Sequence, residues 1–301
     1  MTTLSTRVIS SFNASIEKYE RTNLTDLLSG TNISPQKFKQ MLINELERNV
    51  RLQEVFIKNP ASFFASALYC AELNLSPSSL VGEFFFTVSG EKIKPILGYK
   101  GLVALLLRSD KVKKIWAEVV YNEDDFEYEL GLEPKMVHIP NFNSVKTCDN
   151  IKCIYACAKI EDEVVFKVMT LEEIKTIVEV LETPSEYYFN DKKDPEKWLL
   201  KKVVLKQMSK LMPKEDDRLL KAVSYDDNVE GGGYLVLDEN DSVRVVQGTI
   251  IGRQKPNKKN SIYQTISKLT ENSLPNENND LHLNLDTDVT SVSDNDNTKG
   301  Q

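Results

Sequence analysis

The sequence has no long apolar run, few histidines and few cysteines. No apolar stretch approaches the length of about 18 residues that a membrane-spanning helix needs, so we expect no membrane insertion. The N-terminal residues lack the long apolar segment of a secretory signal, which favours a cytoplasmic protein. The four cysteines form no Cys-x-x-Cys pair, so we expect reduced thiols and no disulfide.

Ligand sets for a metal ion or a nucleotide are also missing. A zinc site built from His138, Cys148, Cys153 and Cys157 matches none of the usual spacings. The segment 231–233 is Gly-Gly-Gly without a following Lys-Ser or Lys-Thr, which indicates a hinge rather than a phosphate loop. We therefore expect no catalytic residue, no resident metal and no cofactor; a dependence on Mg²⁺ stays open, although the sequence shows no ligand set for it.

Positive charge is scarce overall. The net charge is −7, and acidic residues slightly outnumber basic ones even within residues 32–236. This balance excludes a protein that coats nucleic acid by bulk charge. Any contact with nucleic acid has to come from local basic patches.

The most informative stretch is residues 83–114. Phe84, Phe86 and Val88 alternate with Phe85 and Thr87, which predicts a strand. A turn at Ser89-Gly90 and a return strand over 92–97 complete a hairpin, with Pro95 marking an edge. The segment 98–101 then bends the chain into an apolar helix, 102–108. From Lys92 to Lys114 there are seven Lys or Arg against one Asp. Aromatic rings and cations beside a helix N-terminus suit a single-stranded nucleic acid.

The rest of the pattern predicts an α+β fold, in which a small antiparallel sheet with a β-hairpin is packed by helices. Predicted helices begin at Ser34-Pro35, at Asn59-Pro60, at a capping box over 170–173, and at Asp194-Pro195, the last running to Met212. Predicted strands cover 115–121, 126–130, 151–160 and 164–169. We expect a flexible N-terminal arm at 1–31, a DNA-binding core at 32–237, and a largely disordered tail at 238–301, which is rich in Asn, Asp, Ser and Thr.

These motifs together resemble the RecT family of phage and prophage single-strand annealing recombinases. The resemblance rests on the order and spacing of ILGYKGLVALLLRS at 96–109 with its flanks, on DDFEYELG at 124–131, on His138-Ile139-Pro140, and on FKVMT at 166–170. It covers roughly residues 32–229. It implies ATP-independent annealing of single-stranded DNA with its complement, by rings or helical filaments, during phage recombination in the bacterial cytoplasm. Family partners include an exonuclease and often the host single-strand-binding protein.

Three groups of residues are candidate DNA contacts. In the first, Lys100 would hold a phosphate and Tyr99 would stack on a base; the alternative is a tight bend with Tyr99 packed inward. The second group ends a helix, where the helix dipole also favours cations. The third is a lysine stripe without acidic partners at helical spacing, whose alternative is a solvated helix face or, for Lys201, a buried structural cation. The second group is Arg108, Lys111, Lys113 and Lys114, and the third is Lys201, Lys202, Lys206 and Lys210.

Two other functions remain open at this point. One is a non-enzymatic phage interaction or structural protein that uses the basic surface for an acidic partner. The other is a metal-dependent nuclease, for which Asp124 and Asp125, with the more distant His138, are the candidate residues. A polar turn between strands normally carries Asp, and no carboxylate cluster is evident, so we favour the annealing protein.

Overall fold

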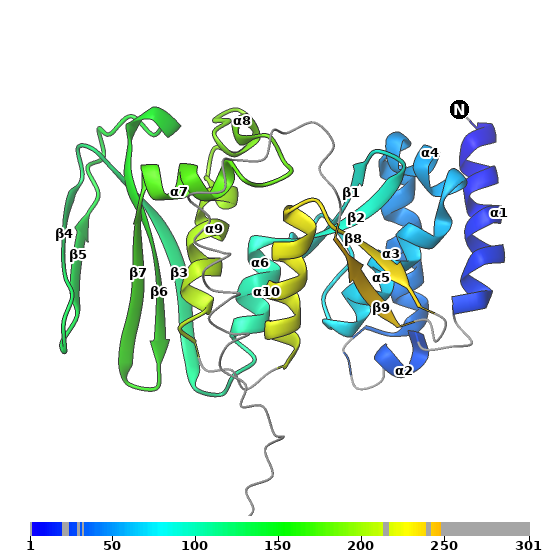
Figure 1. Cartoon of the computed structure of the whole chain (residues 1–301), viewed down its shortest axis with the longest axis horizontal. Coiled ribbons are helices and arrows are strands. Elements are labelled where there is room, and N and C mark those ends of the chain that lie inside the picture. Colours follow the sequence, from blue (N-terminus) through cyan, green and yellow to red (C-terminus); the bar gives the residue numbers. More distant parts are fainter. Residues whose placement is uncertain are drawn as a thin grey trace, which may run out of the picture. The chain divides into compact units, whose positions relative to one another are not determined.

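The computed structural model describes residues 2–19, 24–28, 31, 33–212, 217–238 and 242–247 (Figure 1). All of them belong to one of the two units into which the chain divides, residues 1–251. Helices and antiparallel strands follow one another in an α+β order, as the sequence predicts. None of the described helices is long and apolar enough to cross a membrane.

The N-terminal part of this unit is a layer of helices. Ser34 and Asn59 cap two of them with their side chains, each followed by proline, which confirms both predicted helix starts. The helix α5 is buried along most of its length. The helices are α1 (Thr2–Tyr19), α2 (Thr25–Leu28), α3 (Pro35–Arg48), α4 (Val50–Lys58) and α5 (Pro60–Glu72).

The helix α1 differs from the flexible arm that we expect from the sequence. Val8, Phe12 and Ile16 are buried, and the ring of Phe12 lies 5.6 Å from that of Phe64. These three residues recur every four positions and form a single apolar stripe, too narrow to stand out among polar neighbours. Residues 20–23, 29–30 and 32 lie outside the described part, and the division into arm, core and tail stays a prediction.

The predicted hairpin is present as β1 (Phe84–Ser89) and β2 (Lys92–Leu97), paired from Phe84↔Leu97 to Ser89↔Lys92. Its inner face carries the buried Phe84 and Phe86 and packs on α4 and α5. Its outer face carries the half-buried Phe85. The helix α6 (Tyr99–Leu106) begins earlier than predicted, so Tyr99, Lys100 and Gly101 form its first turn.

A three-stranded antiparallel sheet in the order β3–β6–β7 forms the second part of the unit (Figure 1). Alternate residues of β6 face two different apolar clusters, so both faces of the sheet are covered. Helices α7 and α9 pack on one face, and the β4–β5 hairpin packs on the other. The elements are β3 (Val112–Tyr121), β4 (Asp125–Glu129), β5 (Lys135–Ile139), η2 (Cys148–Asn150), β6 (Ile151–Ile160), β7 (Glu163–Thr170), α7 (Leu171–Val178), α8 (Ser185–Tyr188) and α9 (Trp198–Ser209).

We predict that the helix α9 starts at Asp194-Pro195. In the structure it starts three residues after Pro195, at Trp198. The carboxylate of Asp194 accepts hydrogen bonds from the N–H groups of Trp198 and Leu199, at 2.9 and 2.8 Å. Asp194 therefore caps the helix from a distance. Lys197 occupies the intervening position in a left-handed conformation (φ 57°), and its buried ammonium group pairs with Asp191 at 2.8 Å. This arrangement fixes the position of Trp198.

The remaining described elements are α10 (Asp217–Glu230), β8 (Tyr234–Leu237) and β9 (Val243–Val246). The helix α10 packs on β2 and α6, and β8 and β9 form a hairpin beside α5. The strand β9 lies within the segment that we expect to be a disordered tail. Residues 239–241 and 248–301 of that segment lie outside the described residues.

Candidate nucleic-acid interface

Two adjoining hollows run along the outer face of the β1–β2 hairpin, between it and the elements α8 and α9. Their volumes are about 490 and 450 Å³, and Thr87, Ile96 and Tyr187 line both. We call the two together the hairpin groove. The groove is open to solvent, and its two adjoining hollows suit an extended chain rather than a small compact ligand.

Aromatic side chains line the groove at intervals. Trp198 is 42% exposed and Tyr187 is 49% exposed, whereas Phe85 and Tyr99 are half-buried. The rings of Tyr99 and Trp198 contact each other, with centroids 5.0 Å apart. Burial raises the pKa of Tyr99, and this outweighs the opposing effect of a hydrogen bond with the backbone of Ala117. Tyr99 therefore stays a neutral phenol near neutral pH, and the groove offers several flat faces on which bases can stack.

Each of the two hollows is lined by an exposed cation. Lys100 is exposed in the first hollow and Arg51 is exposed in the second. Within the described residues, neither side chain has an ion-pair partner. A third cation, Lys193, lies 4.7 Å from the ring centre of Tyr187. Aromatic faces beside unpaired cations are the arrangement that binds single-stranded nucleic acids.

The two glycines that bracket Tyr99-Lys100 have a structural explanation. A Cβ atom on Gly98 would lie 2.1 Å from the carbonyl oxygen of Gly82, and one on Gly101 would lie 2.1 Å from that of Glu83. The first turn of α6 is thus pressed against the backbone that leads into β1. This close approach places Lys100 at the mouth of the groove, so the structural and the functional interpretations of this motif both apply.

Two lysines of the stripe on α9, Lys202 and Lys206, are paired with carboxylates, contrary to the absence of acidic partners that we expect. The carboxylates come from α10. Lys202 Nζ lies 2.9 Å from Asp226 Oδ2 and 2.8 Å from Glu230 Oε1. Lys206 Nζ lies 3.0 Å from the same Asp226 atom, 2.9 Å from Asp227 Oδ1, and also contacts Glu230. These carboxylates lie on a different helix, so the i,i+4 spacing within α9 does not reveal them.

These ion pairs shift the pKa values of Lys206 and Asp226. Burial lowers the pKa of Lys206, but the carboxylates of Asp226, Glu230 and Asp227 raise it further, to well above its ordinary value. Burial raises the pKa of Asp226, but Lys202 and Lys206 lower it more, to about 2. Lys206 and Asp226 are therefore both charged at neutral pH. The two lysines therefore support the fold even though both also line the groove.

Four of the ten predicted contact residues line the hairpin groove, namely Tyr99, Lys100, Lys202 and Lys206. The other six do not. Arg108 donates to the carbonyl of Asn74 at 2.7 Å, and Lys113 donates to the carbonyl of Asp110 at 3.0 Å. Lys114 lies 4.9 Å from the ring centre of Trp116, Lys111 is exposed on the turn before β3, and Lys201 pairs with Glu118 at 3.0 Å.

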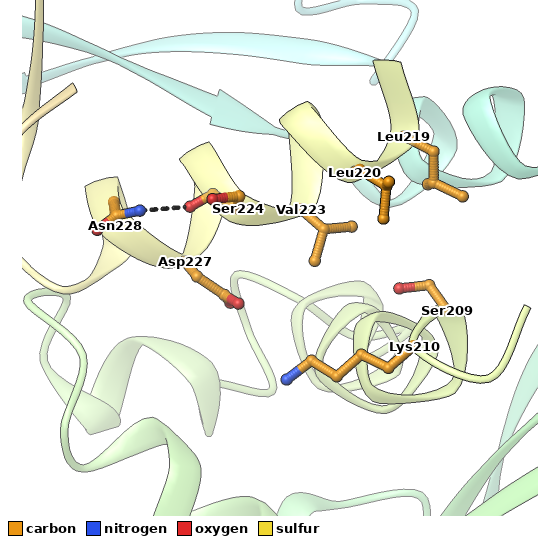
Figure 2. A pocket seen from close by; sticks show the side chains of 8 residues that line it. All are labelled: Ser209, Lys210, Leu219, Leu220, Val223, Ser224, Asp227 and Asn228. Carbon is orange, nitrogen blue, oxygen red and sulfur yellow. Dashed lines mark hydrogen bonds between the residues drawn. The ribbon is translucent and has the colours of Figure 1, made fainter. Parts of the chain in front are cut away.

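The sixth residue, Lys210, lies in a separate hollow of about 380 Å³ between α9 and α10. Figure 2 shows Ser209 and Lys210 from α9 facing Leu220, Val223 and Asp227 from α10. The ammonium group of Lys210 donates to the side chain of Gln207 at 3.1 Å. The predicted lysine stripe is therefore divided between two different surfaces.

The acidic turn near His138 serves the fold. The carboxylate of Asp124 accepts hydrogen bonds from the backbone N–H groups of Tyr121 and Asn141 and from the hydroxyl of Ser144. His138 lies between Asp124 and the hydroxyl of Tyr155, at 3.2 Å from each. In the part of the chain that the structure describes, no cluster of three or more His, Cys, Asp or Glu is arranged to hold a metal ion.

Four residues of the groove are not among the contacts predicted from the sequence: Arg51, Phe85, Tyr187 and Trp198. They come from α4, β1, α8 and α9, so no single stretch of sequence brings them together. The sequence signal that could have identified two of them is the presence of isolated aromatic residues in the segment 183–198. Tyr187 and Trp198 both lie near lysines, which is the same pattern that makes Tyr99-Lys100 a candidate DNA contact.

The fold and the groove define an α+β protein with a surface suited to a single-stranded nucleic acid. The chain belongs to the RecT family, whose model matches residues 36–239. This family comprises DNA recombination and strand-annealing proteins. Protein RecT of Escherichia coli (strain K12) is 30% identical over 125 residues, which are 38% of this chain and 45% of that protein. The match therefore spans less than half of that relative's length.

Proposed function

We propose that this protein binds single-stranded DNA in the hairpin groove and anneals it to its complement without ATP. The single observation that carries the proposal is that the same groove is lined by the exposed rings of Tyr187 and Trp198 and by the exposed cations Lys100 and Arg51. Membership of the RecT family supports it from a separate direction. Bases stack on the rings while the cations neutralise backbone phosphates, so the binding is steeply salt-dependent. We place this activity in phage-type recombination in the bacterial cytoplasm.

The decisive experiment mixes two complementary fluorescent oligonucleotides with the protein and without a nucleotide, at low and moderate salt. Pairing faster than the protein-free rate, with an acceleration that fades as salt rises, is the expected result. Intact oligonucleotides that pair no faster contradict the proposal and favour an interaction protein. Shortened oligonucleotides in the presence of Mg²⁺ favour a nuclease instead.

We also propose that the protein acts as an assembly of several copies. The outer face of the β4–β5 hairpin exposes Val137 (57%) and Ile139 (59%), and its tip exposes Leu132 completely. Exposed apolar side chains in one region commonly mark a protein–protein contact. Mass photometry with and without a long oligonucleotide tests this point, and a monomer under both conditions contradicts it. An exonuclease and a host single-strand-binding protein are the further partners that we propose.

A further inference from the structure

Glu230 occupies an unusual position for a carboxylate. It is the last residue of α10, where the helix dipole disfavours negative charge, and three glycines follow it. Its side chain lines the second hollow of the hairpin groove beside Lys202 and Lys206 and remains 13% exposed. The backbone carbonyl of Glu230 accepts a hydrogen bond from the N–H of Glu182 at 2.6 Å, so its backbone is anchored. Only its side chain is free to exchange partners.

Asp226 forms ion pairs with the same two lysines, Lys202 and Lys206, from a more deeply buried position than Glu230. Its side chain is 2% exposed, it lies within 3.0 Å of both ammonium groups, and it accepts the N–H of Leu97 at 3.2 Å. The two lysines thus face three carboxylates, those of Asp226, Asp227 and Glu230. If the Glu230 side chain leaves, each lysine keeps Asp226. The cluster therefore contains one more carboxylate than the lysines need, and that carboxylate lies at the groove.

We propose that Glu230 is an internal competitor of the DNA backbone, because its carboxylate holds the place at Lys202 and Lys206 that a phosphate would take. The inference rests on the proposed function of the groove. A carboxylate and a phosphodiester are both singly charged and both accept hydrogen bonds from ammonium groups. An entering phosphate has to displace Glu230 or be repelled by it. Glu230 thereby limits the affinity of the groove for single-stranded DNA.

The test is a gain of affinity. Glu230→Gln removes the charge and keeps the length of the side chain. Fluorescence anisotropy with a labelled oligothymidylate, repeated over a range of salt, is expected to show about tenfold tighter binding. The slope of log affinity against log salt is expected to steepen by about 0.7 for each phosphate that the freed lysines gain.

Asp227→Asn is the matched control. Asp227 also pairs with Lys206, at 2.9 Å, and its loss changes the net charge by the same amount. It lines the separate hollow between α9 and α10, however, and not the hairpin groove (Figure 2). We expect this variant to bind the oligonucleotide nearly as the wild type does. An equal gain in both variants means that only net charge matters, and it overturns the inference.

Further variants keep the test decisive. Glu230→Ala should change affinity in the same direction, which covers poor folding of the glutamine variant. Adding Lys202→Met to Glu230→Gln should remove most of the gain, because the freed lysine is then absent. If the wild type binds the oligonucleotide and both Glu230→Gln and Glu230→Ala bind it equally well or more weakly, this inference alone is overturned. No binding by any variant, including the wild type, overturns the proposed function together with it.

Discussion

The rings of Tyr99 and Trp198 lie 5.0 Å apart at an interplanar angle of 51°, across the junction of α6 and α9. Tyr99 supports one side of the indole, and the ammonium group of Lys201 lies 5.0 Å from its ring centre. Asp194 accepts the backbone N–H of Trp198. The indole is therefore held in place while 42% of the residue remains exposed in the groove. Such a fixed face binds a base with little further loss of conformational entropy.

The first prediction concerns this indole. Trp198→Leu keeps an apolar side chain and removes the stacking face, which is worth about 1–3 kcal/mol per base. We expect affinity for an oligothymidylate to fall about tenfold or more, measured by fluorescence anisotropy. Tyr128→Leu is the control, since Tyr128 is 49% exposed on β4 and does not line the groove. Equal losses in the two variants would contradict a stacking role for Trp198.

The second prediction separates two exposed lysines that the sequence alone groups together. Lys100 lines the groove, whereas Lys113 lies on β3 outside it. Lys100→Ala should weaken DNA binding about three- to tenfold near 0.1 M salt and make the salt slope less negative by about 0.7. Lys113→Ala should leave both quantities nearly unchanged. The reverse result would move the interface to the turn between α6 and β3.

Local sequence signals were sufficient for elements whose causes lie within a few residues. The β1–β2 hairpin follows from the alternation at 84–88 and the turn at Ser89-Gly90. The start of α7 follows from Thr170 and Glu173, which form the capping box in the structure. Both signals are short-range hydrogen-bonding or packing patterns, so a single sequence window contains them completely.

The lysine pairs and the groove could not be predicted in this way. The partners of Lys202 and Lys206 lie on a different helix, α10, and only the packing of the two helices brings them together. The groove joins side chains from α4, β1, α8 and α9. Tertiary contacts decide both features, and a single sequence without aligned relatives carries no direct record of such contacts.

The third prediction is that Asp226 is required for stability. Asp226→Asn removes the buried charge that Lys202 and Lys206 share, and we expect a loss of about 3 kcal/mol in the free energy of unfolding. Urea denaturation followed by circular dichroism measures it. Asp227→Asn serves as the comparison, because Asp227 is 44% exposed and its loss should cost under about 1 kcal/mol. Equal stability of the two variants contradicts the structural role of Asp226.

The fourth prediction is the pH dependence of this contribution. The pKa of Asp226 is lowered from 3.8 to about 2 in the folded protein, so folding favours the ionised carboxylate. Its contribution to stability is therefore fully present above about pH 5 and is lost as the pH falls through 3.8 towards 2. Wild-type stability should fall more steeply across that window than the stability of Asp226→Asn. Parallel curves for the two proteins would show that the carboxylate is not preferentially ionised in the folded state.

The last prediction concerns His138, which joins the β4–β5 hairpin to the sheet. Burial raises the pKa of Asp124, but hydrogen bonds from the backbones of Tyr121 and Asn141, from His138 and from Ser144 lower it to about 2. His138→Leu leaves the hydroxyl of Tyr155 and one bond of Asp124 unsatisfied, so we expect a loss of about 1–3 kcal/mol in unfolding free energy. Tyr155→Phe removes only the hydroxyl that His138 contacts, and it should lower the free energy of unfolding by about 1 kcal/mol. Amide hydrogens of β4 and β5 should exchange faster in His138→Leu, while the affinity of the groove for DNA stays the same. If His138 instead served a metal-dependent nuclease, its replacement would abolish Mg²⁺-dependent cleavage of DNA and leave hairpin exchange unaltered.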